Sequence, residues 1–253
     1  MATEPRALLI DITRCIGCRG CVSACQEAHG FPADDAATAL SVKAYTAIVD
    51  HPGDRYVRKL CMHCVNPSCA SVCPVGALRK TAAGPVTYDA RICLGCRYCM
   101  VACPFDVPRY EYSAALPSVR KCDMCVGRAA EGKPPACAEV CPAEATVAGT
   151  RVDLLAEARR RIAENPGQYV DRVYGEHEAG GTSVLFLSPV PFEQLGFKAG
   201  LPDEPFPDIT WGVLEKIPGV VTIGGAALLG ISWITHRRQE VAAAAQEALH
   251  GAH

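Results

Sequence analysis

The sequence predicts an α+β protein made of repeated cysteine-rich modules and ending in a single C-terminal transmembrane helix. The first observation is that all sixteen cysteines fall into four groups of four with closely related spacing. The second is that a short strand-like run precedes the first group and is echoed before the third. The third is that residues 217–235 form a stretch of nineteen residues without a charged side chain.

Each cysteine group opens with Cys-x-x-Cys and closes with Cys-x-x-x-Cys. The groups are Cys15, Cys18, Cys21 and Cys25; Cys61, Cys64, Cys69 and Cys73; Cys93, Cys96, Cys99 and Cys103; and Cys122, Cys125, Cys137 and Cys141. The first and third groups match the ligand run of a bacterial-type [4Fe-4S] cluster, whereas the second and fourth widen its middle gap to four and eleven residues. The sequence therefore predicts four [4Fe-4S] clusters held by these sixteen cysteines.

Disulfide bonds and structural zinc are the two alternatives for this many cysteines. Disulfide frameworks belong to short secreted domains and do not require regular spacing. Structural zinc takes two Cys-x-x-Cys pairs, and a third cysteine at the same short interval has no place in a tetrahedral site. Iron–sulfur clusters explain the pattern better, so the expected chemistry is electron transfer.

The strand-like run and its echo define the expected modules. Residues 7–11 lead into the first cysteine group and residues 86–89 into the third, and each run ends in an aspartate four residues before a cysteine. Strand, cysteine turn and short helix make up half of a bacterial ferredoxin. We therefore expect tandem bacterial-ferredoxin-like modules over residues 1–150. The inner module covers about residues 61–104, and the outer module is split between residues 7–30 and 118–148.

Beyond residue 150 the cysteines stop, and a helix–strand extension is expected over residues 151–199. Apolar residues at helical spacing predict a helix over residues 153–164. An apolar run predicts a strand over residues 182–187. Prolines among acidic residues then indicate an extended linker over residues 200–210.

The uncharged stretch near the C-terminus is long enough for a transmembrane helix, which needs about twenty apolar residues. Trp211 and Trp233 lie near its two ends, where interfacial aromatic residues are common. We therefore expect a membrane anchor at residues 211–236 and a cytoplasmic tail at residues 237–253. The alternative is a buried or interfacial helix of a soluble domain.

The charges beside the anchor predict its orientation. Arg237 and Arg238 follow the span, so the positive-inside rule places the C-terminus in the cytoplasm and the cysteine modules on the periplasmic side. The first nine residues hold no secretory or twin-arginine signal. Both observations are satisfied if the folded chain is exported with a partner that carries the signal. Otherwise the modules face the cytoplasm.

Composition narrows the function further. With 25 basic and 27 acidic side chains, the chain has no electrostatic reason to bind nucleic acid. With only 6 Phe, 8 Tyr and 2 Trp, bound clusters must supply much of the folding energy, and the apoprotein should be poorly folded. The sequence shows no nucleotide-binding loop, open metal site or nucleophile with a base, so the chain is not expected to be an enzyme by itself.

Nearly the whole chain resembles the four-cluster electron-transfer (beta) subunits of membrane-bound respiratory oxidoreductases, in the complex iron–sulfur molybdoenzyme family. The likeness is carried by CMHCVNPSCASVCPVGAL from Cys61, CLGCRYCMVACPFDVPRY from Cys93, KCDMCVGRAAEGKPPACAEVCPAEA from Lys121 and GGTSVLFLSPVPFEQLGF from Gly180. The subunits of formate dehydrogenase and of nickel–iron uptake hydrogenase are the most similar branches.

The resemblance implies an electron-transfer subunit that works between two partners. One would be a catalytic subunit, a molybdenum, tungsten or nickel–iron enzyme, and the other an integral membrane subunit that binds quinone or haem. The alternative is a free polyferredoxin, soluble or peripheral, that shuttles electrons between diffusing partners. The membrane anchor and the cluster-free region 150–210 argue against that alternative.

The resemblance also implies how the cysteines share the clusters. In two-cluster ferredoxins the fourth cysteine of each run ligates the other cluster. The implied sets are Cys15, Cys18, Cys21 with Cys141; Cys122, Cys125, Cys137 with Cys25; Cys61, Cys64, Cys69 with Cys103; and Cys93, Cys96, Cys99 with Cys73. The alternative is that each group closes on its own cluster.

Other residues near the ligands have expected roles. Gly17 and Gly95, inside Cys-x-x-Cys turns, are expected to bring backbone N–H groups close to sulfur. Nearby basic side chains could raise cluster potentials, or could be solvated surface charges. These basic residues are Arg97, Arg109, Arg120 and Lys121.

Overall fold

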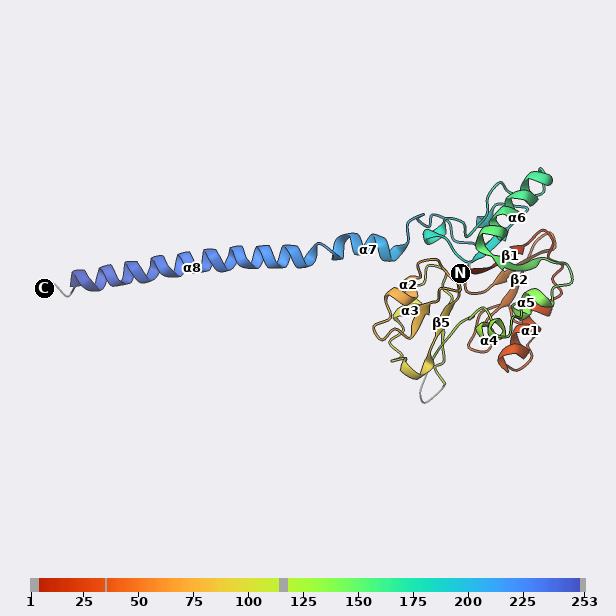
Figure 1. The fold of residues 1–253 in the computed structure, drawn as a ribbon, viewed down its shortest axis with the longest axis horizontal. Coiled ribbons are helices and arrows are strands. Elements are labelled where there is room, and N and C mark those ends of the chain that lie inside the picture. The colour runs from red at the N-terminus through yellow and green to blue at the C-terminus, as the bar shows by residue number, and fades with distance from the viewer. Residues whose placement is uncertain (1–4, 35, 114–117, 251–253) are drawn as a thin grey trace. The chain divides into compact units, whose positions relative to one another are not determined.

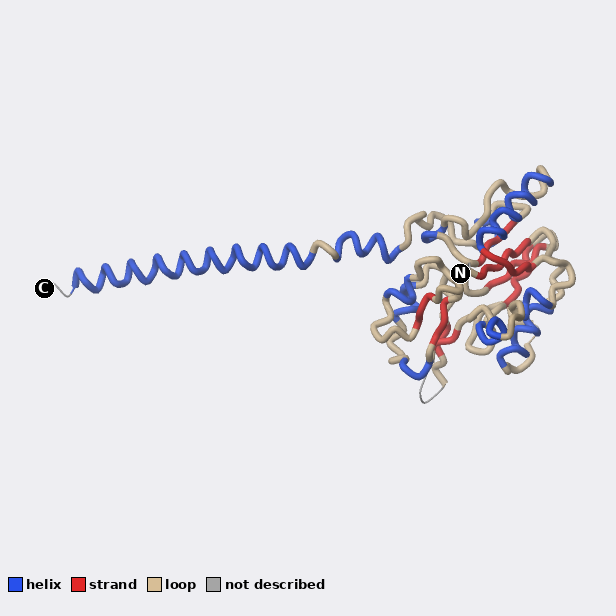
Figure 2. Tube along the Cα trace, viewed as in Figure 1, coloured by secondary structure: helices blue, strands red, loops and turns tan. Residues whose placement is uncertain are grey.

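The structure is a computed structural model that describes residues 5–34, 36–113 and 118–250, and the chain divides into two compact units. The first unit, Met1–Pro207, holds all sixteen cysteines, and the second is Asp208–His253. Figure 1 labels the elements, and Figure 2 shows short helices and strands joined by loops in the first unit and mainly helix in the second. This mixed content agrees with the predicted α+β class.

A three-stranded sheet lies at the centre of the first unit. Its middle strand, β1 (Arg6–Asp11), pairs antiparallel with β8 (Thr146–Thr150) and parallel with β9 (Val184–Leu187). The sheet therefore joins the start of the first cysteine group, the end of the fourth group and the extension.

Strand β1 is buried on both faces. Its successive side chains point to opposite faces of the sheet, and the four consecutive residues Ala7–Ile10 are all apolar. Leu8 and Ile10 enter one core cluster together with Phe186 of β9. Leu9 packs into a second core cluster with Leu154 of α6 (Arg151–Glu164), the helix that follows β8. This helix covers the other face of the sheet.

The two modules contain the remaining strands and most of the short helices. The outer module, predicted over residues 7–30 and 118–148, contains α1 (Gly20–His29), α4 (Val126–Ala130) and α5 (Ala136–Glu139). Strands β2 (Ala47–His51) and β3 (Arg55–Lys59) lie outside these ranges, and we group them with the outer module because Ile48 packs against Val22 of α1. The inner module, predicted over residues 61–104, contains α2 (Ser68–Ser71), β4 (Leu78–Lys80), β5 (Val86–Tyr88), the 3-10 helix η1 (Ala90–Ile92) and α3 (Tyr98–Ala102). Strands β6 (Arg109–Tyr110) and β7 (Val119–Arg120) lie outside that range, and we group them with the inner module because Val119 and Tyr110 pack with Leu78. In Figure 1 helices α1, α4 and α5 lie together on one side, and α2 and α3 lie on the other.

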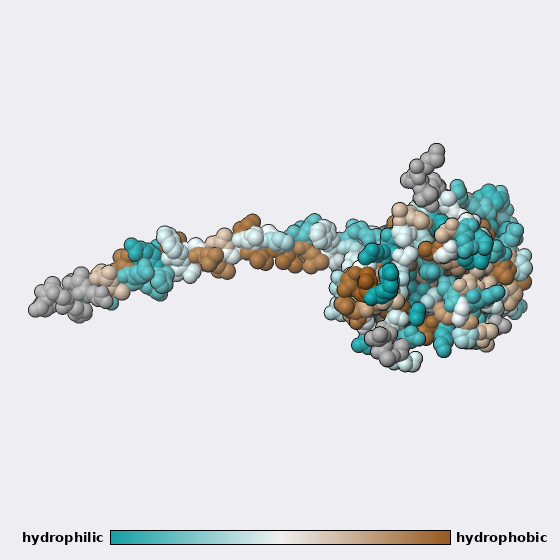
Figure 3. Space-filling model, turned by 60° about the horizontal axis from the view of Figure 1, so that its bottom comes forward, coloured by the Kyte–Doolittle hydropathy of each residue, from teal (hydrophilic) through white to brown (hydrophobic). Residues whose placement is uncertain are grey.

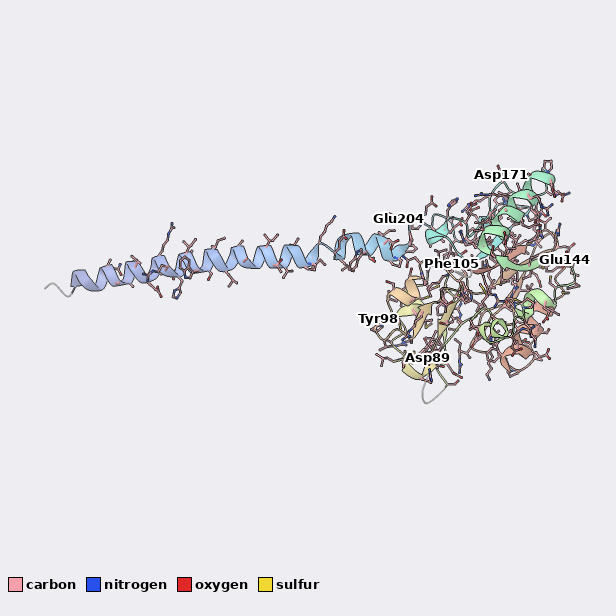
Figure 4. The ribbon with its side chains drawn as sticks, in the orientation of Figure 1. Asp89, Tyr98, Phe105, Glu144, Asp171 and Glu204 are labelled. Atoms are coloured by element: carbon pink, nitrogen blue, oxygen red, sulfur yellow. The ribbon has the colours of Figure 1, made fainter. Side chains whose placement is uncertain are left out.

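The extension consists of α6 (Arg151–Glu164), the 3-10 helices η2 (Glu178–Gly180) and η3 (Phe192–Leu195), and strand β9. Helix α6 begins two residues before the predicted start because Thr150 caps it, its side chain accepting a hydrogen bond from the Asp153 N–H. Most of the buried aromatic residues pack together here. They are the buried Tyr174, Phe186 and Phe192 and the partly buried Phe197. Phe105, labelled in Figure 4, packs edge-on against Tyr174.

The second unit is helical over more of its length than the sequence analysis expected. Helix α7 (Phe206–Leu214) begins inside the region predicted as an extended linker, since proline is tolerated in the first turn of a helix. Helix α8 (Ile217–His250) continues through most of the predicted tail. Strong helix formers and contacts of Arg237 with Glu240 extend it past the apolar stretch.

One helical segment of the described chain, Phe206–Gln246, is long and apolar enough to cross a membrane, with a mean hydropathy of 1.8. None of its most apolar stretch is buried inside the protein, and brown apolar side chains run along it in Figure 3. The 34 residues of α8 correspond to about 50 Å of helix, which exceeds the roughly 30 Å hydrocarbon core of a bilayer. Length, composition and exposure therefore all fit a membrane anchor.

A buried ion pair fixes helix α6 to the central sheet. The Asp11 carboxylate, at the end of β1, is fully buried. Arg161 donates to its Oδ2 from 3.0 Å, and the Tyr169 hydroxyl donates to the same oxygen from 3.0 Å. The Thr13 N–H donates to Oδ1. Because charges are costly to bury alone, each of these groups depends on the others.

Replacing Arg161 by Met should lower the free energy of unfolding by about 3–5 kcal/mol, because Asp11 would lose its buried cation. The neighbouring substitution Arg160→Met is the matched control, since it breaks only exposed pairs with Glu157 and Glu164 and should change stability little. Thermal unfolding of detergent-solubilised protein, followed by circular dichroism, measures both. Equal effects of the two substitutions would rule out a structural role for the buried pair.

Candidate metal centres

The four Cys-x-x-Cys turns share one backbone conformation. The third residue of each turn has a positive φ angle, 68° at Gly17, 49° at His63, 68° at Gly95 and 58° at Met124. This conformation directs the N–H of that residue toward the first cysteine of the turn. The N–H of Gly95 lies 3.4 Å from Cys93 Sγ, and the N–H of Met124 lies 3.3 Å from Cys122 Sγ. Glycine adopts this conformation freely, whereas His63 and Met124 adopt it at a cost.

Glycine is also required at two of these turns because an aromatic ring covers each of them. A Cβ atom on Gly17 would lie 2.5 Å from the ring of Tyr56, and one on Gly95 would lie 2.9 Å from the hydroxyl of Tyr110. Tyr56 and Tyr110 thus occupy corresponding positions in the outer and inner modules.

The third cysteine of every group is the second residue of a short helix. These cysteines are Cys21 in α1, Cys69 in α2, Cys99 in α3 and Cys137 in α5. The fourth cysteine follows four residues later: Cys25 lies within α1, whereas Cys73, Cys103 and Cys141 lie just beyond the ends of α2, α3 and α5. The helix therefore positions the third cysteine of each group, and the fourth follows it at a constant spacing.

This register explains why two groups tolerate a wider middle gap. In the second group the extra residues lie before Pro67, which precedes α2. In the fourth group they form α4 and the loop to Pro135, which precedes α5. In both groups the insertion lies between the cysteine turn and the helix, so neither ligand-bearing element is disturbed.

The structure brings thiols from different groups together at two cavities. Cys15, Cys18, Cys21 and Cys141 line one cavity, and we name them the first outer set. Cys73, Cys93, Cys96 and Cys99 line the other, and we name them the second inner set. Each set takes three thiols from one group and the fourth thiol from another.

The remaining thiols form two sets that are more deeply buried. Burial, and then the charges of Cys61, Cys103 and Cys69, raise the pKa of Cys64, and we name these four residues the first inner set. Burial, and then the charge of Cys25, raise the pKa of Cys122. Burial also raises the pKa of Cys125, and the charge of Cys137 adds to this rise. The charge of Cys61 acts on Cys122 as well, so we follow the predicted ligation in naming Cys25, Cys122, Cys125 and Cys137 the second outer set.

Eight of the sixteen thiols have pKa values raised above the ordinary range. Burial is the largest cause and neighbouring thiols add to it, raising the pKa of Cys69 to about 12 and that of Cys99 to about 11. The pKa of Cys73 shifts the other way: burial opposes ionisation, but backbone N–H groups that follow this residue outweigh burial and lower its pKa. Thiolates this close together repel one another, and a bound metal would neutralise part of their negative charge.

The donor set fits iron–sulfur clusters. All sixteen cysteines are free thiols, and soft thiolates in sets of four are the ligands that such clusters take. His29, Asp123 and Cys125 also lie close enough together to hold a metal ion. His29 Nε2 and Asp123 Oδ1 already contact each other at 3.1 Å, however, and Cys125 belongs to the second outer set.

The basic residues singled out from the sequence divide into two kinds. Three contact nearby aromatic or acidic side chains: Arg97 lies over the Tyr110 ring, Arg109 pairs with Asp106, and Arg120 pairs with Glu111. Lys121 alone is buried, and its ammonium group donates to the carbonyl oxygens of Val86 and Cys122.

Two further cations near the thiols, the half-buried Lys80 and the buried Arg58, were missed from the sequence. Lys80 donates to the carbonyl oxygen of Cys64 from 2.8 Å, and burial lowers its pKa to about 8. Arg58 lines the cavity of the first outer set and is 3% exposed. Neither residue is part of a cysteine motif, so the spacing carries no signal for them.

Thiol sets held by tandem α+β modules define an iron–sulfur protein of the ferredoxin-like electron-transfer class. The chain matches 4Fe-4S dicluster domains over residues 7–75 and 54–151. A protein of Nitratidesulfovibrio vulgaris is 45% identical over 94% of this chain and 69% of its own length. The predicted tandem ferredoxin-like fold is confirmed.

Two further relatives indicate the family more closely. The hydrogenase-2 operon protein HybA of Escherichia coli is 39% identical over 74% of this chain and 71% of its own length. The iron–sulfur subunit of nitrate-inducible formate dehydrogenase of Escherichia coli is 34% identical over 79% of this chain and 73% of its own length. The chain therefore belongs to the family of iron–sulfur subunits that includes these proteins, and the predicted family is confirmed.

Replacing Cys141 by Ala should remove or alter the same centre as replacing Cys18, because both thiols line one cavity. Electron paramagnetic resonance of the reduced protein would show one matching spectral change for these two variants. Cys125→Ala is the control and should alter a different signal. If Cys141→Ala instead reproduced the effect of Cys125→Ala, each group would close on its own cluster.

Proposed function

We propose that this chain relays electrons through four [4Fe-4S] clusters between a catalytic subunit and a quinone-reactive membrane subunit, and has no catalytic site of its own. Membership of the family supports the electron-transfer role, and the names of the relatives support a hydrogenase or formate dehydrogenase as the catalytic partner. Sixteen free thiols in four sets support the number of clusters. Each bound cluster would accept and release one electron at a time.

The observation that carries the proposal is the unbranched order in which the thiol sets approach one another. The first outer set meets the second outer set where Cys137 lies near Cys21. Burial raises the pKa of Cys21. The positive charge of Arg58 opposes this rise, and the charge of Cys137 adds to it. The second outer set meets the first inner set at Cys61, whose charge acts on Cys122 after burial and Cys25.

The order continues into the inner module. Burial and Cys61 raise the pKa of Cys69, and Cys99 of the second inner set contributes further along. The same pairs share packed clusters: Cys137 with Cys21, Cys61 with Cys122, and Cys99 with Cys69. This packing supports the order first outer, second outer, first inner, second inner. Short steps between successive sets are what a chain of electron carriers requires.

The two ends of this order are also the places where thiols reach the surface. Cys18 and Cys96 are the exposed cysteines, one in each terminal set. The rim of the second inner set is apolar, with Leu94 69%, Tyr98 60% and Val101 88% exposed. Figure 4 labels Tyr98 at the edge of the first unit, and Figure 3 shows a brown patch on this unit. We assign one partner to each end.

Membrane anchoring is supported by α8 and its flanks. Trp233 lies near the end of the apolar stretch, and Arg237 and Arg238 follow it. By the positive-inside rule these arginines stay in the cytoplasm, so we propose that the cysteine-bearing unit faces the periplasm and is exported with its catalytic partner. The sixteen thiols would then be loaded before export.

A stop codon after Pro207 should move the chain, or its complex, from the membrane to the soluble fraction, because the whole second unit is lost. A stop after Gln246 is the control, since it keeps the full candidate span and should stay in the membrane. Membrane flotation followed by immunoblotting measures both. Retention of the Pro207 truncation would mean that a partner, not α8, holds the chain there.

The complex purified through this chain from detergent-solubilised membranes should reduce a dye with either formate or hydrogen. Activity with one donor identifies the catalytic partner, and Cys96→Ala should then abolish quinone-linked or dye-linked turnover by removing a terminal ligand. Activity with neither donor would point to another molybdenum or tungsten subunit. The absence of any co-purifying large subunit would contradict the proposal and favour a free polyferredoxin.

A further inference from the structure

Arg58 is a buried cation in the middle of the outer module. It belongs to strand β3 opposite Ile48 of β2, and only 3% of its surface is exposed. Its Nε donates to the Thr46 hydroxyl from 2.8 Å, and its Nη1 donates to the Thr146 hydroxyl from 3.2 Å. Two strands far apart in sequence therefore hold the guanidinium in one position.

The hydroxyl partners do not neutralise the charge. Thr46 donates its own proton to the Lys59 carbonyl oxygen, so towards Arg58 it acts only as an acceptor. Within the described part of the chain, Arg58 forms no ion pair with a carboxylate, and no acidic residue is among the main influences on it. A guanidinium cannot escape burial by losing its proton. A buried charge of this kind needs an anionic partner.

The anionic groups around Arg58 are thiols of both outer sets. It lines the cavity formed by Cys15, Cys18, Cys21 and Cys141. Cys137 of the second outer set packs in the same core cluster as Cys21, and its charge and that of Cys122 are among the main influences on Arg58. Although burial opposes it, these thiols raise the pKa of Arg58 above its ordinary value.

We infer that Arg58 is the shared counter-ion of the two outer clusters, and that its permanent charge stabilises their reduced states. This inference rests on the proposed four-cluster function. A cluster with four thiolate ligands is anionic and gains one more negative charge on reduction, and nearby charge and hydrogen bonds to sulfur set its potential. One fixed cation between two such centres raises both midpoint potentials and leaves the inner pair unchanged.

Three substitutions test this in the full chain within its membrane complex. Arg58→Met removes the charge and keeps a long stem, and Arg58→Lys keeps the charge but not the forked donors. Arg55→Met is the matched control, because Arg55 lies on the same strand and bonds only the exposed Pro52 carbonyl. Iron and acid-labile sulfide are counted first on the full chain purified without its partners and reconstituted, where about sixteen of each are expected for four cubane clusters. Potentiometric titration followed by electron paramagnetic resonance then gives the midpoints.

We expect Arg58→Met to move two of the four midpoints to more negative values by at least about 59 mV, a tenfold fall in the ratio of reduced to oxidised cluster for a one-electron couple. Arg58→Lys and Arg55→Met should stay within that limit. If Arg58→Met instead lost about half of the iron while Arg58→Lys kept it, the charge would be needed to hold the outer clusters at all, which also supports the inference.

Other results would overturn it. Unchanged midpoints in Arg58→Met, or an equal shift of all four, would show that the charge does not act on the outer pair. Loss of iron in Arg58→Lys as severe as in Arg58→Met would make the shape of the side chain, not its charge, the requirement. A wild-type iron content near eight would contradict the four-cluster function, whatever difference separates the two Arg58 variants.

Discussion

The convergence of cysteine thiols from distant parts of the chain is the constraint on which the rest of this fold depends. Cys141 returns to the turn that holds Cys15 because β8 pairs with β1, so the sheet and the first outer set require each other. A metal centre that joins such distant residues restricts the unfolded chain as a cross-link does. The apolar core is modest by comparison, since the buried aromatic rings gather around Tyr174 in the extension.

The charges inside the first unit follow a simple division. The two buried carboxylates of the described chain, Asp11 and Glu178, are each paired with an arginine of the extension. The buried cations Arg58 and Lys121 lie instead beside thiols and carbonyl oxygens of the ligand turns. The carboxylate nearest a thiol set, Asp123 beside Cys125, is partly exposed and paired with His29, so little uncompensated negative charge is added where bound clusters would already be anionic.

Much of this site was predictable because ligand spacing and helix register are local properties of the chain. The cysteine groups, the tandem modules and helix α6 followed from spacing and periodicity over a few residues. The left-handed backbone of His63 and Met124 did not, since neither residue type favours it. The buried position of Arg58 could not be predicted either, because its hydrogen-bond partners Thr46 and Thr146 lie far apart in the sequence. The first five residues of helix α7 were predicted as extended linker because Pro207, which its first turn accommodates, follows Pro202 and Pro205.

The position of the third cysteine at the second residue of a helix has a consequence for recognising such proteins. A search pattern with fixed gaps of two, two and three residues finds two of the four groups and misses those of Cys69 and Cys137. A description that joins a Cys-x-x-Cys turn to a helix with cysteine at its second position, and to a further cysteine four residues later, finds all four. Length variation between turn and helix is therefore a dimension along which related chains can diverge while their ligand geometry stays the same.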